Sequence, residues 1–260
     1  VPAPFRFCLS CGVAYSARQA ADFGKLTTLG SAGRSTSTSV LALSAVQELR
    51  AEPTLPDSAK KLLSFSDNRQ DASLQAGHFN DFVEIGLLRS ALYRAVDAAG
   101  CSGLTHDVLA QRVFDELNLP TELYAKDPEL RGPAKDRTDE VLREVIAYRI
   151  YRDQMRGWLL TSPNLEQTGL LTIAYDGLDE CCADEEMWSL EAPPWLDVDD
   201  RDPHPALVGA RPEDRKRVAS VLLDHMRREL AIRVDVLDPA KQEGLRQRWS
   251  QRLTGPWAID

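Results

Sequence analysis

The sequence of 260 residues lacks several features that mark large classes of proteins. No run approaches the about 18 consecutive apolar residues that a membrane span requires, and Val1–Arg6 contains no apolar signal-peptide core. The five cysteines are an odd number at spacings that make a poor disulfide framework. These absences predict a protein of a reducing, cytoplasmic compartment without a membrane partner.

Catalytic motifs are missing as well. Gly24–Leu26 lacks the earlier glycine and the Ser or Thr of a phosphate-binding loop. Asp179–Cys182 is not the acidic box that coordinates Mg²⁺ for nucleotide hydrolysis, and neither a His-Glu-x-x-His helix nor a Gly-x-Ser-x-Gly elbow occurs. None of the four histidines has a partner at catalytic spacing. We therefore predict no catalytic residue in this chain.

The charge is unevenly distributed. The whole sequence carries a net charge of −9, whereas its first hundred residues hold ten basic and nine acidic side chains. The excess of negative charge thus lies in the remaining residues and would repel phosphate chains at long range. If the protein contacts nucleic acid, we expect that contact to be local and within the first hundred residues.

The hydrophobic pattern predicts a mainly α fold, a multi-helix domain with a few short strands. Short strands are expected at 61–66 and 170–175. Thr105 is placed to cap a helix and Gly100 to end one. Apolar residues at helical spacing predict helices at about 39–50, 67–82, 83–99, 105–117, 137–160, 211–230 and 239–253.

Two further patterns on these helices are explained by the fold and do not require a functional site. On the predicted helix 211–230, the apolar face is Val218, Val221, Leu222, His225, Met226 and Leu230, where a hydrogen-bonded core histidine is expected. Basic side chains on two helices are interpreted as solvated faces rather than a nucleic-acid surface; they are Arg149, Arg152, Arg156, Arg211, Arg215, Lys216 and Arg217.

A Cys-x-x-Cys-Gly turn stands near the start of the chain. The thiolates of Cys8 and Cys11, with Gly12 freeing the backbone, suit half of a tetrahedral zinc site. A complete site needs two more ligands, and the adjacent pair Cys181–Cys182 has the wrong geometry to supply them. The alternative is two partly buried thiols in a β-turn, and both interpretations stay open.

One segment resembles a known family. Lys61–Ser73, with the sequence KLLSFSDNRQDAS, resembles the opening of the second RecA-like domain, around motif IV, of superfamily 2 DEAD/DEAH-box helicases. Its continuation to Phe82, together with Phe5–Gly12 and Gly33–Thr36, is similar to a subgroup of large bacterial helicases. After residue 100 the resemblance is confined mainly to 163–171.

The resemblance implies a site and a set of partners. A strand would lead into a helix whose amino end, with Ser66, Asn68 and Arg69, contacts the phosphates of DNA or RNA. Alternatively, Arg69 pairs with Asp71 and only stabilises the fold. ATP and Mg²⁺ would be bound by other RecA-like segments of the parent protein in cis, because the chain lacks those motifs.

The resemblance also suggests a division of the chain. Residues 1–57 would hold the Cys-x-x-Cys turn, a Ser/Thr-rich loop and a linker helix, residues 58–100 the strand-helix unit, and residues 101–260 a helical insertion. Two hypotheses follow for function. The chain is part of an ATP-dependent helicase, or it is a non-catalytic module whose helical region binds a protein partner.

Overall fold

The computed structural model describes residues 29–63, 69–155, 164–188 and 204–259, without the side chains of 29–36, 69–71 and 74. The predicted mainly α fold is confirmed. The α-helices are α1 (Leu29–Ala51), α2 (Arg69–Ala99), α3 (His106–Leu117), α4 (Pro133–Gln154), α5 (Leu178–Ala183), α6 (Pro205–Val208), α7 (Pro212–Arg228) and α8 (Pro239–Arg252). Single 3-10 turns are η2 (Asp57–Ala59), η3 (Gly100–Ser102), η4 (Thr121–Leu123), η5 (Asp235–Leu237) and η6 (Gly255–Trp257).

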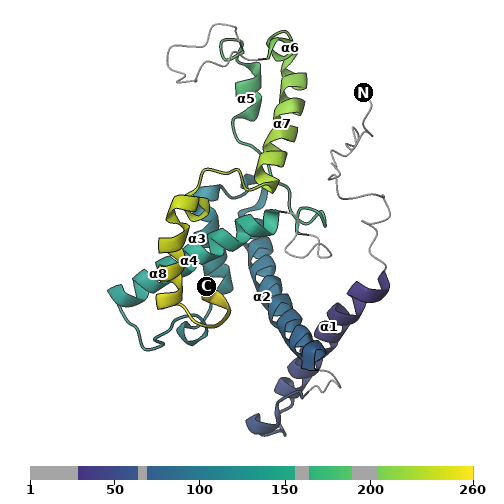
Figure 1. The fold of residues 1–260 in the computed structure, drawn as a ribbon, viewed down its shortest axis with the longest axis vertical. Helices are drawn as coiled ribbons and strands as arrows, with labels where there is room; N and C mark the ends of the chain where they lie inside the picture. Colours follow the sequence, from purple (N-terminus) through teal and green to yellow (C-terminus); the bar gives the residue numbers. More distant parts are fainter. Residues whose placement is uncertain (1–28, 64–68, 156–163, 189–203, 260) are drawn as a thin grey trace.

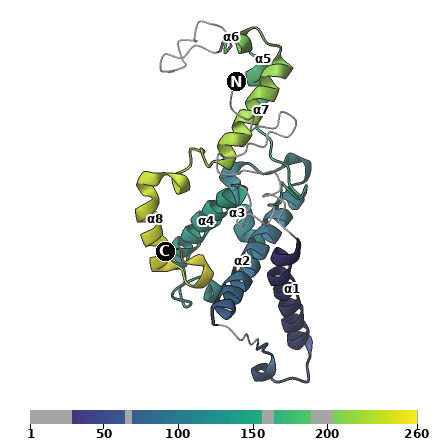
Figure 2. The same ribbon diagram turned by 45° about the vertical axis from the view of Figure 1, so that its right-hand side comes forward.

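The helices form a body with two extensions (Figures 1 and 2). Helices α2, α3, α4 and α8 pack together and are called the body. Helix α1 lies beside the amino-terminal half of α2 at one end. At the opposite end α7 projects away from the body with α5 and α6 beside its distal half, and these three helices are called the arm.

The core of the body is built around α4. Its side chains Leu142, Val145 and Ile146 are completely buried against α2 and α3. On the other side Trp249 of α8 packs on Tyr148, with 5.2 Å between the ring centroids. Each large apolar side chain buried in this way stabilises the fold by about 1.5–3 kcal/mol. The body is therefore the stable part of the molecule.

Local sequence signals fix the starts of several helices. Thr105 precedes α3 in extended conformation, at the predicted cap position, but its side chain makes no capping hydrogen bond to the backbone. Pro133 occupies the first turn of α4, where its missing N–H costs nothing. Asp238 caps α8 by accepting a hydrogen bond from the amide of Ala240 at 2.9 Å. Helices α3 and α8 thus begin where the sequence predicts.

Other boundaries differ from the prediction. Helix α1 begins at Leu29, about ten residues early, so the predicted Ser/Thr-rich loop is helical. Helix α2 is continuous where two helices were expected, because no proline or cap interrupts 82–83. Helix α4 runs over Pro133–Gln154 rather than from 137. Helix α5 has six residues, too few for its periodicity to predict it.

The strand predictions are wrong where the structure describes them. Residues 61–63 and 171–175 are irregular, and the Leu63 side chain, expected to be buried, is 77% exposed. Among the described residues the β-pairing is the single bridge between Ala125 and Leu253. A strand needs a neighbour for its backbone N–H and C=O groups, and no described segment pairs with 61–63 or 171–175.

The predicted boundary between residues 100 and 101 falls in η3, between two helices that pack on one another. The carboxyl-terminal half of α2 contributes Leu88, Ala91 and Leu92 to the same core as α3 and α4. In the described part of the chain, no helix combines the length and the apolar character that a bilayer crossing demands.

Candidate functional site

The residues predicted to contact phosphate lie at the start of α2. Arg69 is the first described residue of this helix, and residues 64–68, with the predicted polar turn, lie outside the described residues. Ser66 and Asn68 lie outside the described residues, and so does the Arg69 side chain. In the first turn of any α-helix four backbone N–H groups have no partner within the helix. These donors and the partial positive charge of the helix end suit an anion.

Contacts farther along α2 hold this helix in place. The hydroxyl of Ser39 in α1, which is completely buried, lies 3.1 Å from Nδ1 of His78. The His78 ring stacks on Phe82 one turn later. Near the middle of α2, Arg89 binds both carboxylate oxygens of the buried Asp153 at the end of α4, the shortest contact being 2.7 Å. Helix α2 is therefore fastened to α1 and to the end of α4.

The proposed zinc ligands Cys8 and Cys11 lie outside the described residues. Within the described ranges, no group of three or more His, Cys, Asp or Glu side chains is arranged to hold a metal ion. Cys101 is exposed, and burial raises the pKa of the Cys182 thiol, which disfavours its metal-binding thiolate form.

Near the start of α7, Arg215 contradicts the prediction of a solvated basic face, whereas Arg211, Lys216 and Arg217 are exposed as predicted. Arg215 is 1% exposed and binds both carboxylate oxygens of Glu185, at 3.0 and 3.1 Å. It also donates to the backbone carbonyls of Cys182, Leu207 and Val208, and its guanidinium lies 5.3 Å from the centre of the Trp188 ring. Arg215 therefore joins α5, α6 and α7.

A second buried arginine joins the arm to the body. Arg227 is 7% exposed and binds both oxygens of Glu166, at 2.7 and 2.8 Å, and Gln154 at the end of α4. Tyr175 donates a hydrogen bond to Asp224 at 2.8 Å and lies beside the same guanidinium. Burial opposes the charged form of Arg227, but the hydrogen bonds to Tyr175 and Glu166 raise its pKa.

The segment that resembles the helicase family after residue 100 has a structural role. Asn164 and Gln167 each accept a hydrogen bond from the backbone N–H of the other, which closes a turn. The Asn164 amide also donates to the carbonyl of Asp153 at 3.2 Å. This turn places Glu166 against Arg227, so the segment connects the body to the arm.

On α4, Arg149 departs from the solvated interpretation, whereas Arg152 is exposed as predicted. Arg149 contacts the Glu84 carboxylate and the Pro256 carbonyl, and its guanidinium lies 5.1 Å from the Trp257 ring centre. Burial, with a smaller effect of Arg152, lowers the Arg149 pKa to about 10. Arg152 lies over the Tyr148 ring, while Arg156 is outside the described residues. These contacts serve packing.

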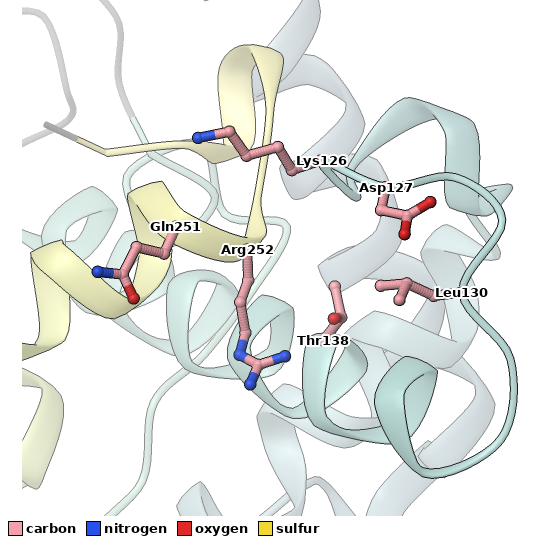
Figure 3. Close-up of a pocket in the computed structure, with 6 residues that line it drawn as sticks. All are labelled: Lys126, Asp127, Leu130, Thr138, Gln251 and Arg252. Carbon is pink, nitrogen blue, oxygen red and sulfur yellow. The ribbon is translucent and has the colours of Figure 1, made fainter.

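Two surface hollows lie among the described residues. One, of about 270 Å³, lies between the loop before α4 and the end of α8 and is smaller than the about 300–1,000 Å³ typical of ligand sites. The other, of about 430 Å³, lies between the end of α2 and α3, is within that range, and is lined by Arg112, Asp115 and Glu116 besides small and apolar residues. Figure 3 shows the terminal groups of Lys126, Asp127 and Arg252 pointing in different directions. No common point exists at which they could hold one substrate.

The last notable surface is an apolar one. Val218, Val221, Leu222 and Met226 (the α7 stripe) are all exposed, although they were predicted to face the core. His225, which lies between them, is exposed rather than buried. Sequence periodicity therefore identified the apolar face of α7 correctly, but the expectation that this face is buried in the core was wrong.

Comparisons with known proteins give no assignment. No family model matches the chain, and neither the curated proteins nor the solved structures include a significant match.

Proposed function

We propose that this chain is part of an ATP-dependent DNA or RNA helicase of the superfamily 2 DEAD/DEAH-box type, found in the cytoplasm. It contributes a nucleic-acid contact at the start of α2 and a helical accessory region, and it is not catalytic alone. ATP and Mg²⁺ are assigned to RecA-like segments of the parent protein outside this chain. The proposal rests on the sequence resemblance of 61–82.

One structural observation carries the proposal further. Arg69, the arginine of the segment that resembles motif IV, is helical and is the first described residue of α2. A phosphate at this point meets the free amides of the first helical turn, the positive end of the helix and one guanidinium group. These interactions read the backbone of a strand and carry no information on base sequence.

The way α2 is held supports the same role. A strand-gripping helix must resist the load that a motor applies, and α2 is fastened by Ser39 in α1 and by the ion pair between Arg89 and Asp153. The polar groups of the hollow between the loop before α4 and the end of α8 do not converge, which fits an accessory region whose chemistry takes place elsewhere.

The contact at Arg69 is tested by nucleic-acid binding. In the protein extended by its flanking sequence, Arg69→Ala should weaken binding of a fluorescent single-stranded oligonucleotide. It should also reduce the slope of log K against log salt concentration by about 0.7–0.9, because one fewer phosphate is neutralised. Fluorescence anisotropy at several salt concentrations measures both quantities.

Arg137→Ala is the matched control, since Arg137 is an exposed helical arginine in α4. It should leave affinity and slope unchanged. Equal affinities and slopes for the wild type and Arg69→Ala would remove Arg69 from the contact, and identical losses in both variants would indicate a general charge effect.

The α7 stripe favours a second candidate function, a non-catalytic protein interaction module. Four exposed large apolar side chains on one helix are unusual for a free surface, and such patches mark interaction sites. This candidate predicts that the chain binds a defined protein through α7 and binds no oligonucleotide. Retention of oligonucleotide binding by Leu222→Asp, together with its loss in Arg69→Ala, would favour the helicase role.

A further inference from the structure

The hollow between the end of α2 and α3 is called the α2–α3 hollow. Its volume of about 430 Å³ falls within the range of small-molecule sites. Ala95, which lines it, lies about 40 Å along the continuous helix α2 from Arg69, so the hollow is separate from the proposed nucleic-acid contact. The other residues on which the argument depends are Ala98, Ala99, Leu104, Val108, Arg112 and Asp115.

Small side chains on α2 leave this space open. The three alanines are three and four residues apart and therefore share one face of the helix. Each carries a methyl group where packed helices usually fill the space with larger side chains. The hollow extends from the turn at Gly103, whose φ of +63° favours glycine, to Glu116, which pairs with Arg94 of α2 at 3.1 Å.

The part of the hollow nearest η3 is apolar. Leu104 and Val108 lie there with the three alanines, and Val108 is 38% exposed. A branched aliphatic group on this wall would leave water and cover the valine. The hydrophobic effect therefore favours a ligand with such a group.

The polar part of the hollow holds one positive and one negative charge without an ion-pair partner. Glu116 is neutralised by Arg94. Asp115 accepts a hydrogen bond from the neutral amide of Gln111 at 2.7 Å. Within the described part of the chain, the Arg112 side chain makes neither a hydrogen bond nor an ion pair. Arg112 and Asp115 are thus the charges that a ligand can complement.

We propose that the α2–α3 hollow binds the zwitterion of a free aliphatic α-amino acid. The ligand carboxylate pairs with Arg112, whose planar guanidinium matches a carboxylate with two parallel hydrogen bonds. The ligand ammonium group pairs with Asp115, three residues later on the same face of α3. The ligand side chain covers Val108 and Leu104. The inference is independent of the helicase proposal.

A ligand with a single charge fits this site less well. A simple carboxylate would bring its negative charge near Asp115 and Glu116, which line the same hollow. A simple amine would bring its positive charge near Arg112. The zwitterion satisfies both charges of the site and adds no net charge.

L-leucine is the probe for this site. Saturation-transfer difference NMR with the 260-residue chain should give a saturable signal and a dissociation constant of about 1 mM or below. Arg112→Gln and Asp115→Asn should each raise this constant about threefold to fivefold, the effect of one exposed ion pair. Ala99→Leu, which fills the apolar part, should raise it at least about tenfold.

Two analogues of leucine assign each charge. Isocaproate lacks the ammonium group and isoamylamine lacks the carboxylate, so both should bind more weakly than leucine. Asp115→Asn should not weaken the binding of isocaproate, and Arg112→Gln should not weaken the binding of isoamylamine. Losses in the opposite combinations would overturn the assignment of the two charges.

Matched controls lie outside the hollow. Arg137→Gln, at an exposed position in α4, and Ala76→Leu, at an exposed position in α2, should leave the dissociation constant for leucine unchanged. Circular dichroism checks that each variant remains helical. No saturable signal up to about 10 mM leucine, or an unchanged constant in both Arg112→Gln and Asp115→Asn, overturns the proposal. These two side chains are exposed, so the test stays decisive even if Ala99→Leu does not fold.

Discussion

The buried guanidinium of Arg215 gives the sharpest prediction about stability. Replacing it by methionine keeps the unbranched stem but removes its donors to the carbonyls of Cys182, Leu207 and Val208. Each buried acceptor left without a partner costs about 1–3 kcal/mol. The Glu185 carboxylate regains water on its own, since its side chain is 71% exposed. The Leu207 carbonyl still accepts from the Ala210 amide at 3.2 Å, so only the carbonyls of Cys182 and Val208 lose the donor that counts here. We therefore expect a loss of about 2–4 kcal/mol, confined to the arm.

Hydrogen exchange measures this loss locally. In Arg215→Met, amides of α5 and α6 should exchange about 30-fold to about 1,000-fold faster, because each factor of ten corresponds to about 1.4 kcal/mol. Amides in the middle of α4 should keep their protection, since α4 lies in the core of the body. The neighbouring Arg217→Met is the matched control, because that side chain is 80% exposed, and it should change nothing.

Arg215→Lys separates charge from geometry. Lysine keeps the positive charge, but its single ammonium group cannot bind a carboxylate and three carbonyls at once as the planar guanidinium does. The stability of Arg215→Lys should therefore lie between those of the wild type and Arg215→Met. Unchanged exchange in α5 and α6 of Arg215→Met, or an equal loss in α4, would refute the assignment of Arg215 as the connector of the arm.

The same ion pair predicts a pH dependence. The hydrogen bond from Arg215 lowers the pKa of Glu185 below its ordinary value of 4.5. The contribution of this carboxylate is therefore complete above about pH 4.5 and is lost as the pH falls through the lowered pKa. Arm protection in the wild type should decrease in that acidic range, and Glu185→Gln should show a flatter profile.

Two further predictions concern the core and the metal. Trp249→Ala should lower the free energy of unfolding, measured with urea, by about 3–5 kcal/mol, because it empties a fully buried site and leaves Glu144 without its indole partner. The control Leu170→Ala, at an exposed position, should lower it by less than about 0.5 kcal/mol. Elemental analysis should find clearly less than one zinc per chain, and a full equivalent would require two ligands besides Cys8 and Cys11.

The sequence predicts those parts of the fold that depend on local signals. Helices α3 and α8 begin within one residue of their predicted starts at 105 and 239, and Asp238 caps α8, because such signals act over two or three residues. Strand formation depends on a neighbour distant in sequence, and for this reason Leu63 was wrongly assigned to a buried strand.

The arm could not be predicted because tertiary contacts reverse the usual roles of its residues. Arg215 looks like one more solvated arginine in a basic run, and only α5, six residues long, makes it an internal connector. Glu185, which follows α5, carries no signal that it binds this arginine. The periodicity of α7 marks an apolar face without revealing that Leu222 is exposed. Contacts of this kind depend on segments far apart in the chain.

ATP hydrolysis provides the most direct measurement of the helicase account. A longer polypeptide that includes the flanking sequence on both sides should hydrolyse ATP faster when single-stranded DNA or RNA is added, whereas the 260-residue chain alone should not hydrolyse ATP. Nucleic-acid-independent hydrolysis by the longer polypeptide, or hydrolysis by the chain alone, would contradict the account.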